Sequence, residues 1–172
     1  SDALVLPVTT RFGFPSVVKQ GGLYTMLLAK VPNLYRATST DRVNWTIQTT
    51  PVITPGVASW APDALFNPSL TCGEGDYPYT NYFGGRKKIT WRVVAGGWGR
   101  AISQDGDTWL VNALARVQFM GAKAWRHWDV MEVGDETVVW YSDKDDQGLS
   151  RIQLAYTDPV WDTADIQDRI CP

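Results

Sequence analysis

One short pattern occurs twice in the chain and restricts what it can fold into. The segment SQDGDTW at residues 103–109 repeats the spacing of STDRVNW at residues 39–45, so that Ser, Asp and Trp hold the same relative positions. A shortened version follows at residues 155–161, where Ala, Thr, Asp and Trp occur in the same order. A motif that returns at intervals of tens of residues indicates a repeat architecture.

The residues before each motif also share one order. Every unit has a strand, a glycine turn, an apolar strand, a loop and a third strand that ends in Ala. The first unit runs from Phe14 to Thr46 and the third from Trp128 to Asp162, and the second contains the segment from Lys87 to Leu110. The strands are rich in β-branched and aromatic residues and are bounded by Gly, Pro, Asp or Asn. The one helical candidate is short, at residues 162–170. We therefore predict a single all-β domain over residues 1–172, with antiparallel sheets arranged radially like propeller blades.

The repeated motif has a structural explanation. A Ser hydroxyl and an Asp carboxylate can accept hydrogen bonds from backbone N–H groups of the turn that follows them. The small Ala lets its strand approach neighbours near a crowded axis, and the Trp is expected to pack against the next blade. We predict that Asp41 and Asp105 are structural, with catalysis by either of them as the alternative.

The charge of the chain argues against two classes of partner. Lys and Arg number 16 and Asp and Glu number 18, which gives a net charge of -2. This balance gives no reason to expect binding to nucleic acid or to an anionic membrane. The basic run at residues 84–88 fits a solvated hairpin end, and no apolar run approaches the length needed to cross a bilayer. We expect a soluble protein, with an extracellular or virion-associated location favoured.

Several kinds of chemical site are excluded or disfavoured. His127 is the one histidine, so a three-histidine zinc site is excluded, and no cofactor or metal is predicted. Cys72 and Cys171 lack metal or redox spacing and leave a single disulfide open. The glycosylation sequon at Asn44 lies inside the repeated motif, where a structural role is favoured. The glycine-rich run at residues 93–101 precedes a strand rather than a helix, so it does not predict a nucleotide site.

The segments WAPDALF at residues 60–66 and FPSVVKQGGLYTMLL at residues 14–28, with the repeated turns, resemble the five-bladed β-propeller glycoside hydrolases of families 43 and 32. The arabinan- and xylan-acting enzymes of family 43 are the most similar. The resemblance implies a substrate funnel at the axis, formed by the first strand of each blade. It also implies an Asp base on the first blade, an Asp in Trp-Ala-Pro-Asp on the second and a Glu acid on the third. Asp63 matches the second of these.

The chain departs from this pattern at the other two positions. Phe14 stands where the resemblance expects the base, and its counterpart on the third blade falls near His127, while Glu132 is displaced. An inverting glycosidase needs two carboxyl groups about 6.5–9.5 Å apart, and a Phe cannot deprotonate water. The leading prediction is a non-catalytic carbohydrate-recognition or structural propeller module, such as a surface or virus-particle component. The alternative is a divergent inverting glycoside hydrolase acting on furanoside or xylose-type polysaccharides, using Asp63 with Asp129 or Glu132.

Aromatic and polar residues around the expected funnel suit a carbohydrate ligand, because sugar rings offer an apolar face and a rim of hydroxyls. The predicted ligand-binding residues are Trp60, Asp63, Trp125, Arg126, His127 and Trp128. Blade packing is the competing role for each Trp, and His127 either acts as a general acid or donates a structural hydrogen bond. Three units do not close a five-bladed ring. We expect either degenerate strands from residues 64–83 or 116–125, or a homo-oligomer or larger assembly.

Overall fold

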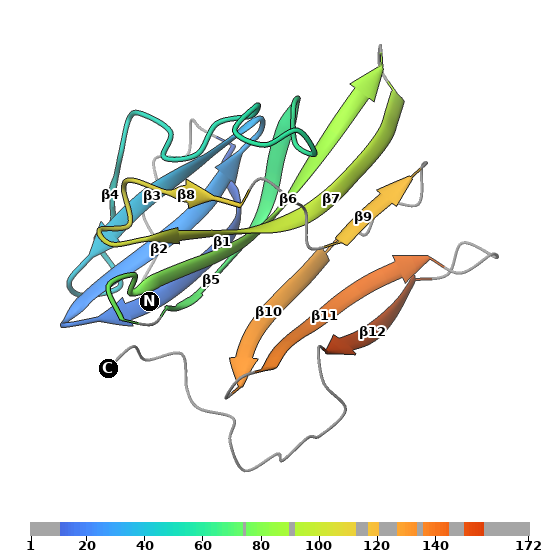
Figure 1. The fold of residues 1–172 in the computed structure, drawn as a ribbon. Coiled ribbons are helices and arrows are strands. Elements are labelled where there is room, and N and C mark those ends of the chain that lie inside the picture. Colours follow the sequence, from blue (N-terminus) through green and yellow to red (C-terminus); the bar gives the residue numbers. More distant parts are fainter. Residues whose placement is uncertain are drawn as a thin grey trace.

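The computed structural model consists of three antiparallel sheets that follow one another along the chain (Figure 1). The structure describes residues 11–73, 75–89, 92–112, 117–120, 127–133, 136–144 and 150–156. Every element in this part of the chain is a strand. The prediction of an all-β fold is confirmed, and the helical candidate at residues 162–170 lies outside the described residues.

The first sheet contains four strands in the order of the sequence. They are β1 (Gly13–Gln20), β2 (Leu23–Lys30), β3 (Asn33–Ser39) and β4 (Thr46–Ile47). Each of the first three strands alternates or concentrates apolar residues, and tight turns join them. This sheet coincides with the first predicted unit.

The second sheet is longer than its predicted unit. It contains β5 (Ala64–Cys72), β6 (Tyr79–Ile89), β7 (Arg92–Ser103) and β8 (Leu110–Val111), and β9 (Val117–Met120) pairs with β7. The segment from Lys87 to Leu110, on which the second unit was recognised, covers only the later part of this sheet, because Lys87 lies near the end of β6 and the first strand is β5. The segment at residues 64–83, expected to be at most a degenerate strand, supplies β5 and the start of β6.

The third sheet contains three strands in the described part of the chain. They are β10 (His127–Val133), β11 (Glu136–Lys144) and β12 (Ser150–Tyr156), in that order. They match the strands of the third predicted unit, and its shortened turn at residues 157–161 lies outside the described residues.

The first strands of the three sheets meet. β5 contacts both β1 and β10, and the N–H of Leu65 in β5 donates to the carbonyl of Pro32 between β2 and β3, at 2.9 Å. The short strands β4 and β8 form the other end of their sheets. The three sheets therefore spread from a shared line of first strands, as a radial arrangement requires (Figure 1).

An indole ring joins the first sheet to the second. Trp60 is 7% exposed and packs in one cluster with Leu34 of β3 and Phe83 of β6. Its ring lies directly over two glycines of the second sheet, because a Cβ on Gly85 would come within 2.7 Å of Trp60 Cζ3 and a Cβ on Gly99 within 3.0 Å of Cε2. Only glycine allows the indole to approach the sheet this closely.

The repeated turns hold their own backbone together, as predicted. In the first turn, Ser39 Oγ accepts from the N–H of Arg42 at 2.9 Å, and Asp41 Oδ1 accepts from Val43 and Asn44 at 2.9 and 2.7 Å. The Trp45 indole N–H donates to the Arg42 carbonyl at 2.9 Å. The role of Asp41 as a structural residue is confirmed.

The second turn repeats these bonds. Ser103 Oγ accepts from the N–H of Gly106 at 2.8 Å, and Asp105 Oδ1 accepts from Asp107 and Thr108, both at 2.8 Å. Trp109 donates to the Gly106 carbonyl at 3.0 Å. Each turn returns the chain to a short fourth strand, which explains why the motif recurs.

Two details of the predicted motif were wrong. Ala37 and Ala101 lie on the third strands, where they pair with Ile47 and Val111 of the fourth strands, and not beside the axis. Trp109 packs against a cluster that contains Leu34 of the first sheet, so its described contacts lie on the side of the preceding sheet. The small Ala side chains leave room for the neighbouring Trp rings.

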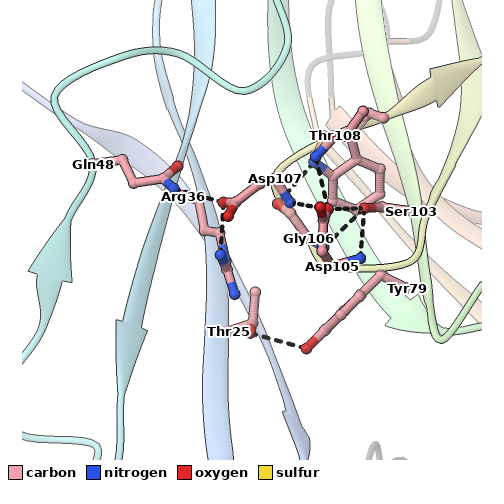
Figure 2. A network of polar contacts seen from close by, with 10 residues as sticks. Thr25, Arg36, Gln48, Tyr79, Ser103, Asp105, Gly106, Asp107 and Thr108 are labelled. Atoms are coloured by element: carbon pink, nitrogen blue, oxygen red, sulfur yellow. Dashed lines mark hydrogen bonds and ion pairs between the residues drawn. The ribbon is translucent and has the colours of Figure 1, made fainter.

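An ion pair links the first sheet to the second turn (Figure 2). Arg36 of β3 donates through Nη1 to Asp107 Oδ1 at 2.6 Å, and Gln48 Nε2 donates to the same oxygen at 2.6 Å. Nearby, Thr25 Oγ1 donates to the Tyr79 hydroxyl at 3.5 Å. These contacts fasten the turn of the second sheet to the first sheet.

The sequence left open the role of the sequon at Asn44 and the pairing of Cys72. Asn44 of the sequon donates through Nδ2 to Asp41 Oδ2 at 2.7 Å, as part of the turn. Cys72 at the end of β5 is disulfide-bonded, and Cys171 lies outside the described residues.

Replacing Gly85 with Ala should destabilise the protein by about 1–3 kcal/mol, because the new methyl group would collide with Trp60 and the backbone of Ala61. The matched control is Gly13→Ala, since a Cβ at Gly13 meets nothing within 4 Å. Urea unfolding of both variants measures the difference. Equal midpoints for the two variants would show that Trp60 does not depend on the close approach.

The acid sensitivity of the fold should depend on Asp105. Backbone hydrogen bonds from Thr108 and Asp107 lower the pKa of Asp105, so this carboxylate contributes stability above its unfolded pKa of about 3.9, and that stability is lost as the pH falls through the lower folded pKa. Asp105→Asn should lower the urea midpoint at pH 7 and lose less stability than the wild type between pH 5 and pH 3. Asp76→Asn, which removes an exposed carboxylate, should keep the wild-type pH profile.

Candidate functional site

The first strands of the three sheets carry a polar residue at the same register. Gln20 is the last paired residue of β1, and Val133 is the last paired residue of β10. Ser16 lies four positions before Gln20, and Asp129 lies four positions before Val133. Ser69 holds the matching place in β5, directly after an irregularity of the same kind as that before Ser16. These three positions define what we call the axial row.

The irregularities before Ser16 and Ser69 have the same sequence pattern, a residue followed by Pro and Ser. The residue before Pro adopts a left-handed backbone in both strands, with φ of 55° at Phe14 and 48° at Asn67. This conformation costs a non-glycine residue about 1–3 kcal/mol and collects at functional sites. Phe14 and Asn67 are therefore equivalent positions, and His127 occupies the corresponding position two residues before Asp129.

Hydrogen bonds connect the axial row from sheet to sheet. Ser16 Oγ accepts from the N–H of Leu70 in β5, at 2.9 Å. Ser69 Oγ donates to Asp129 Oδ1 in β10, at 2.7 Å. Ser69 is 1% exposed, whereas Asp129 is exposed. The bond thus orients a carboxylate that reaches solvent where the first strands meet.

The two other predicted carboxylates lie on the same strands or beside them. Asp63 is exposed and immediately precedes β5, and its N–H donates to the Arg86 carbonyl at 3.2 Å. It stands four positions before Asn67 (67 − 63), so the Trp-Ala-Pro-Asp segment precedes the bulge rather than forming it. Glu132 pairs with Thr137 through the backbone of β10, and its side chain is outside the described part.

The structure gives the predicted aromatic and basic residues different surroundings. Trp60 is buried against Phe83, with ring centroids 5.3 Å apart, and donates to the Asn112 carbonyl at 3.4 Å. His127 and Trp128 begin β10, but only their backbone is described. Trp125 and Arg126 lie outside the described residues. Asp63 and Asp129 are therefore the predicted site residues with described, exposed side chains.

Sequence reasoning missed Asn67 and Ser69. The signal was present, because Pro68-Ser69 after Asn67 repeats Pro15-Ser16 after Phe14. The Trp-Ala-Pro-Asp segment matches the family resemblance more directly, at a position that precedes β5.

The described part of the chain offers neither a metal site nor a membrane-spanning helix. Among these residues, no group of three or more His, Cys, Asp or Glu side chains is placed to hold a metal ion. The same residues include no helix capable of crossing a bilayer.

No protein-family model matches the sequence, and no curated protein matches it. Solved structures do match. They include a sucrose-6-phosphate hydrolase from Lactobacillus gasseri, with a TM-score of 0.69 and 13% identity over 86% of this chain and 32% of that protein. A family 117 glycoside hydrolase from Zobellia galactanivorans has a TM-score of 0.64 and 14% identity, over 86% and 52%.

A family 43 β-xylosidase/α-arabinofuranosidase from a compost metagenome is also similar, with a TM-score of 0.59 and 12% identity over 81% of this chain and 46% of that enzyme. The chain thus spans 32–52% of the length of these three proteins. Their low identities show a shared fold and nothing finer. The chain has the fold of the β-propeller glycoside hydrolases.

Proposed function

We propose that this protein is a carbohydrate-active propeller of the glycoside hydrolase type, in which the line of first strands binds a glycan and exposed carboxylates act on it. The observation that carries the proposal is the bond from buried Ser69 to exposed Asp129, which orients a carboxylate where β5 and β10 meet. The fold shared with several glycoside hydrolases supports the choice of a carbohydrate-active function.

The chemistry would need two carboxyl groups on opposite sides of a glycosidic bond. Asp129 is positioned by Ser69 and suits the role of base, since a hydrogen bond from a buried hydroxyl fixes its direction. Asp63 is exposed beside β5 and is the partner that the sequence resemblance suggests. Glu132 is the alternative partner on β10.

The proteins with this fold suggest which substrate class to test first. The similar structures include a β-fructofuranosidase and a β-xylosidase/α-arabinofuranosidase. Furanoside and xylose-type oligosaccharides are therefore the first substrates to test. We propose no cofactor.

A second function is favoured by one observation. Phe14 is 42% exposed and occupies the axial position before Pro15, where the sequence resemblance expects a catalytic base. An exposed phenyl ring there suits binding of a sugar face without hydrolysis. A non-catalytic carbohydrate-recognition module, including one on a cell surface or a virus particle, is the alternative.

Hydrolysis should depend on Asp129. Incubation with arabino- and xylo-oligosaccharides, followed by a reducing-sugar assay, should show turnover that Asp129→Asn reduces at least about 100-fold, as expected when a general acid or base is removed. Asp63→Asn should reduce it as well. Asp76→Asn, which changes an exposed carboxylate in the loop between β5 and β6, should leave turnover unchanged.

The outcomes separate the two functions. Binding on a glycan array without turnover, together with loss of binding in Phe14→Ala, would support the recognition module and contradict the hydrolase. Turnover equal in Asp129→Asn and wild type would contradict the proposed site. Absence of both binding and turnover for all glycans would reject both functions.

A further inference from the structure

Phe14 is the one exposed aromatic residue among the side chains that the structure describes. It is 42% exposed, and the other exposed large apolar residues of this part of the chain are aliphatic, namely Val31, Val43, Val57 and Leu110. A phenyl ring stabilises a fold mainly by being removed from water. Since much of the Phe14 ring stays in water, packing alone does not explain an aromatic residue at this position.

The backbone of Phe14 is unfavourable for the side chain that it carries. Its φ of 55° lies in the left-handed region, where a bulky side chain is disfavoured and Asn is tolerated much better. Asn67 stands at the matching position of β5, with a φ of 48° and a side chain that is 4% exposed. The same bulge therefore holds a buried amide in one sheet and an exposed phenyl ring in the other. Strain of this kind collects at ligand sites.

Phe14 lies near the carboxylate that we propose acts on a glycan. Ser16 Oγ accepts from the N–H of Leu70 at 2.9 Å. Ser69, the residue before Leu70, donates to Asp129 Oδ1 at 2.7 Å. Because a strand rises about 3.3 Å per residue, Phe14 stands at most about 7 Å along β1 from Ser16. The exposed ring and the exposed carboxylate are thus within the span of a short oligosaccharide.

We propose that Phe14 is a binding platform on which a pyranose ring with equatorial hydroxyl groups stacks, and that the protein keeps this phenyl ring although it lowers the stability of the fold. In such a sugar the hydroxyls point outward, so the axial C–H bonds form an apolar face that fits an aromatic ring. A furanose ring is puckered and offers no comparable face. The choice of a saccharide rests on the proposed function, and the inference concerns binding rather than hydrolysis.

The first experiment measures binding by isothermal titration calorimetry in the Asp129→Asn background, so that substrate is not consumed. The Asn side chain keeps an oxygen that can accept from Ser69. Xylo- and cello-oligosaccharides should bind about tenfold more tightly than arabinofurano-oligosaccharides of the same length, as expected for stacking on one aromatic ring. Adding Phe14→Asn should weaken pyranoside binding about tenfold and remove the preference, whereas Phe14→Tyr should change the affinity less than twofold.

The second experiment measures stability, with an expected change of opposite sign. Phe14→Asn in the otherwise wild-type protein should raise the urea midpoint, because Asn tolerates the left-handed backbone. A variant that is more stable and binds more weakly has not lost its fold. Leu110→Asn is the matched control, since it replaces another exposed apolar side chain, in β8 at the other end of the second sheet from β5. It should not raise the midpoint, and it should change glycan affinity less than twofold.

Three outcomes would overturn the platform even if Asp129-dependent hydrolysis is found. The first is equal pyranoside affinity with and without Phe14→Asn, or equal affinity for pyranosides and furanosides. The second is a lower urea midpoint in Phe14→Asn, which would show that packing holds the ring. The third is a dimer in analytical ultracentrifugation that Phe14→Asn dissociates, which would assign the ring to a contact between copies.

The failure of this inference and that of the proposed function can be told apart. Phe14-dependent binding of pyranosides, without hydrolysis by the wild-type protein, would support the platform and leave the hydrolase proposal contradicted. Hydrolysis that depends on Asp129 and is unchanged in Phe14→Asn would do the reverse.

Discussion

The packing of one indole ring against two glycines is the constraint on which the arrangement of the sheets depends. Trp60 lies over Gly85 and Gly99 and stacks beside Phe83, so it fixes the distance between the first and second sheets. β5 follows Trp60 by a few residues and takes its position from this packing. Because β5 lies between β1 and β10, the whole axial row depends on it.

The second of the repeated turns contributes to the same interface from its outer side. Each turn satisfies its own backbone through a Ser and an Asp, and thereby becomes a rigid unit that can carry other contacts. In the second turn, Asp107 receives Arg36 from the first sheet, and Trp109 enters the shared core. The turn thus stabilises one side of its sheet, whereas the first strand on the other side sets the geometry at the axis.

Local patterns in the sequence predicted much of the fold. Alternating strands and the Ser, Asp and Trp spacing identified the first and third sheets and the structural role of Asp41, because these features depend on neighbouring residues. Pairing between distant segments was harder to predict. The bond from Ser69 to Asp129 joins residues 60 positions apart, and β5 was missed because its proline bulge interrupts the alternation. The burial of Trp60 depends on two glycines far along the chain, which no local pattern reveals.

The matching bulges in β1 and β5 have a consequence for how such a protein can diversify. The backbone before Pro15 and Pro68 is shaped by the proline and the strand, while the side chain displayed there is a phenyl ring in one sheet and an amide in the other. The side chain displayed at the axis can therefore differ while the backbone conformation stays the same. A duplicated scaffold of this kind can acquire or lose reactivity through single codon changes, without a new fold having to arise.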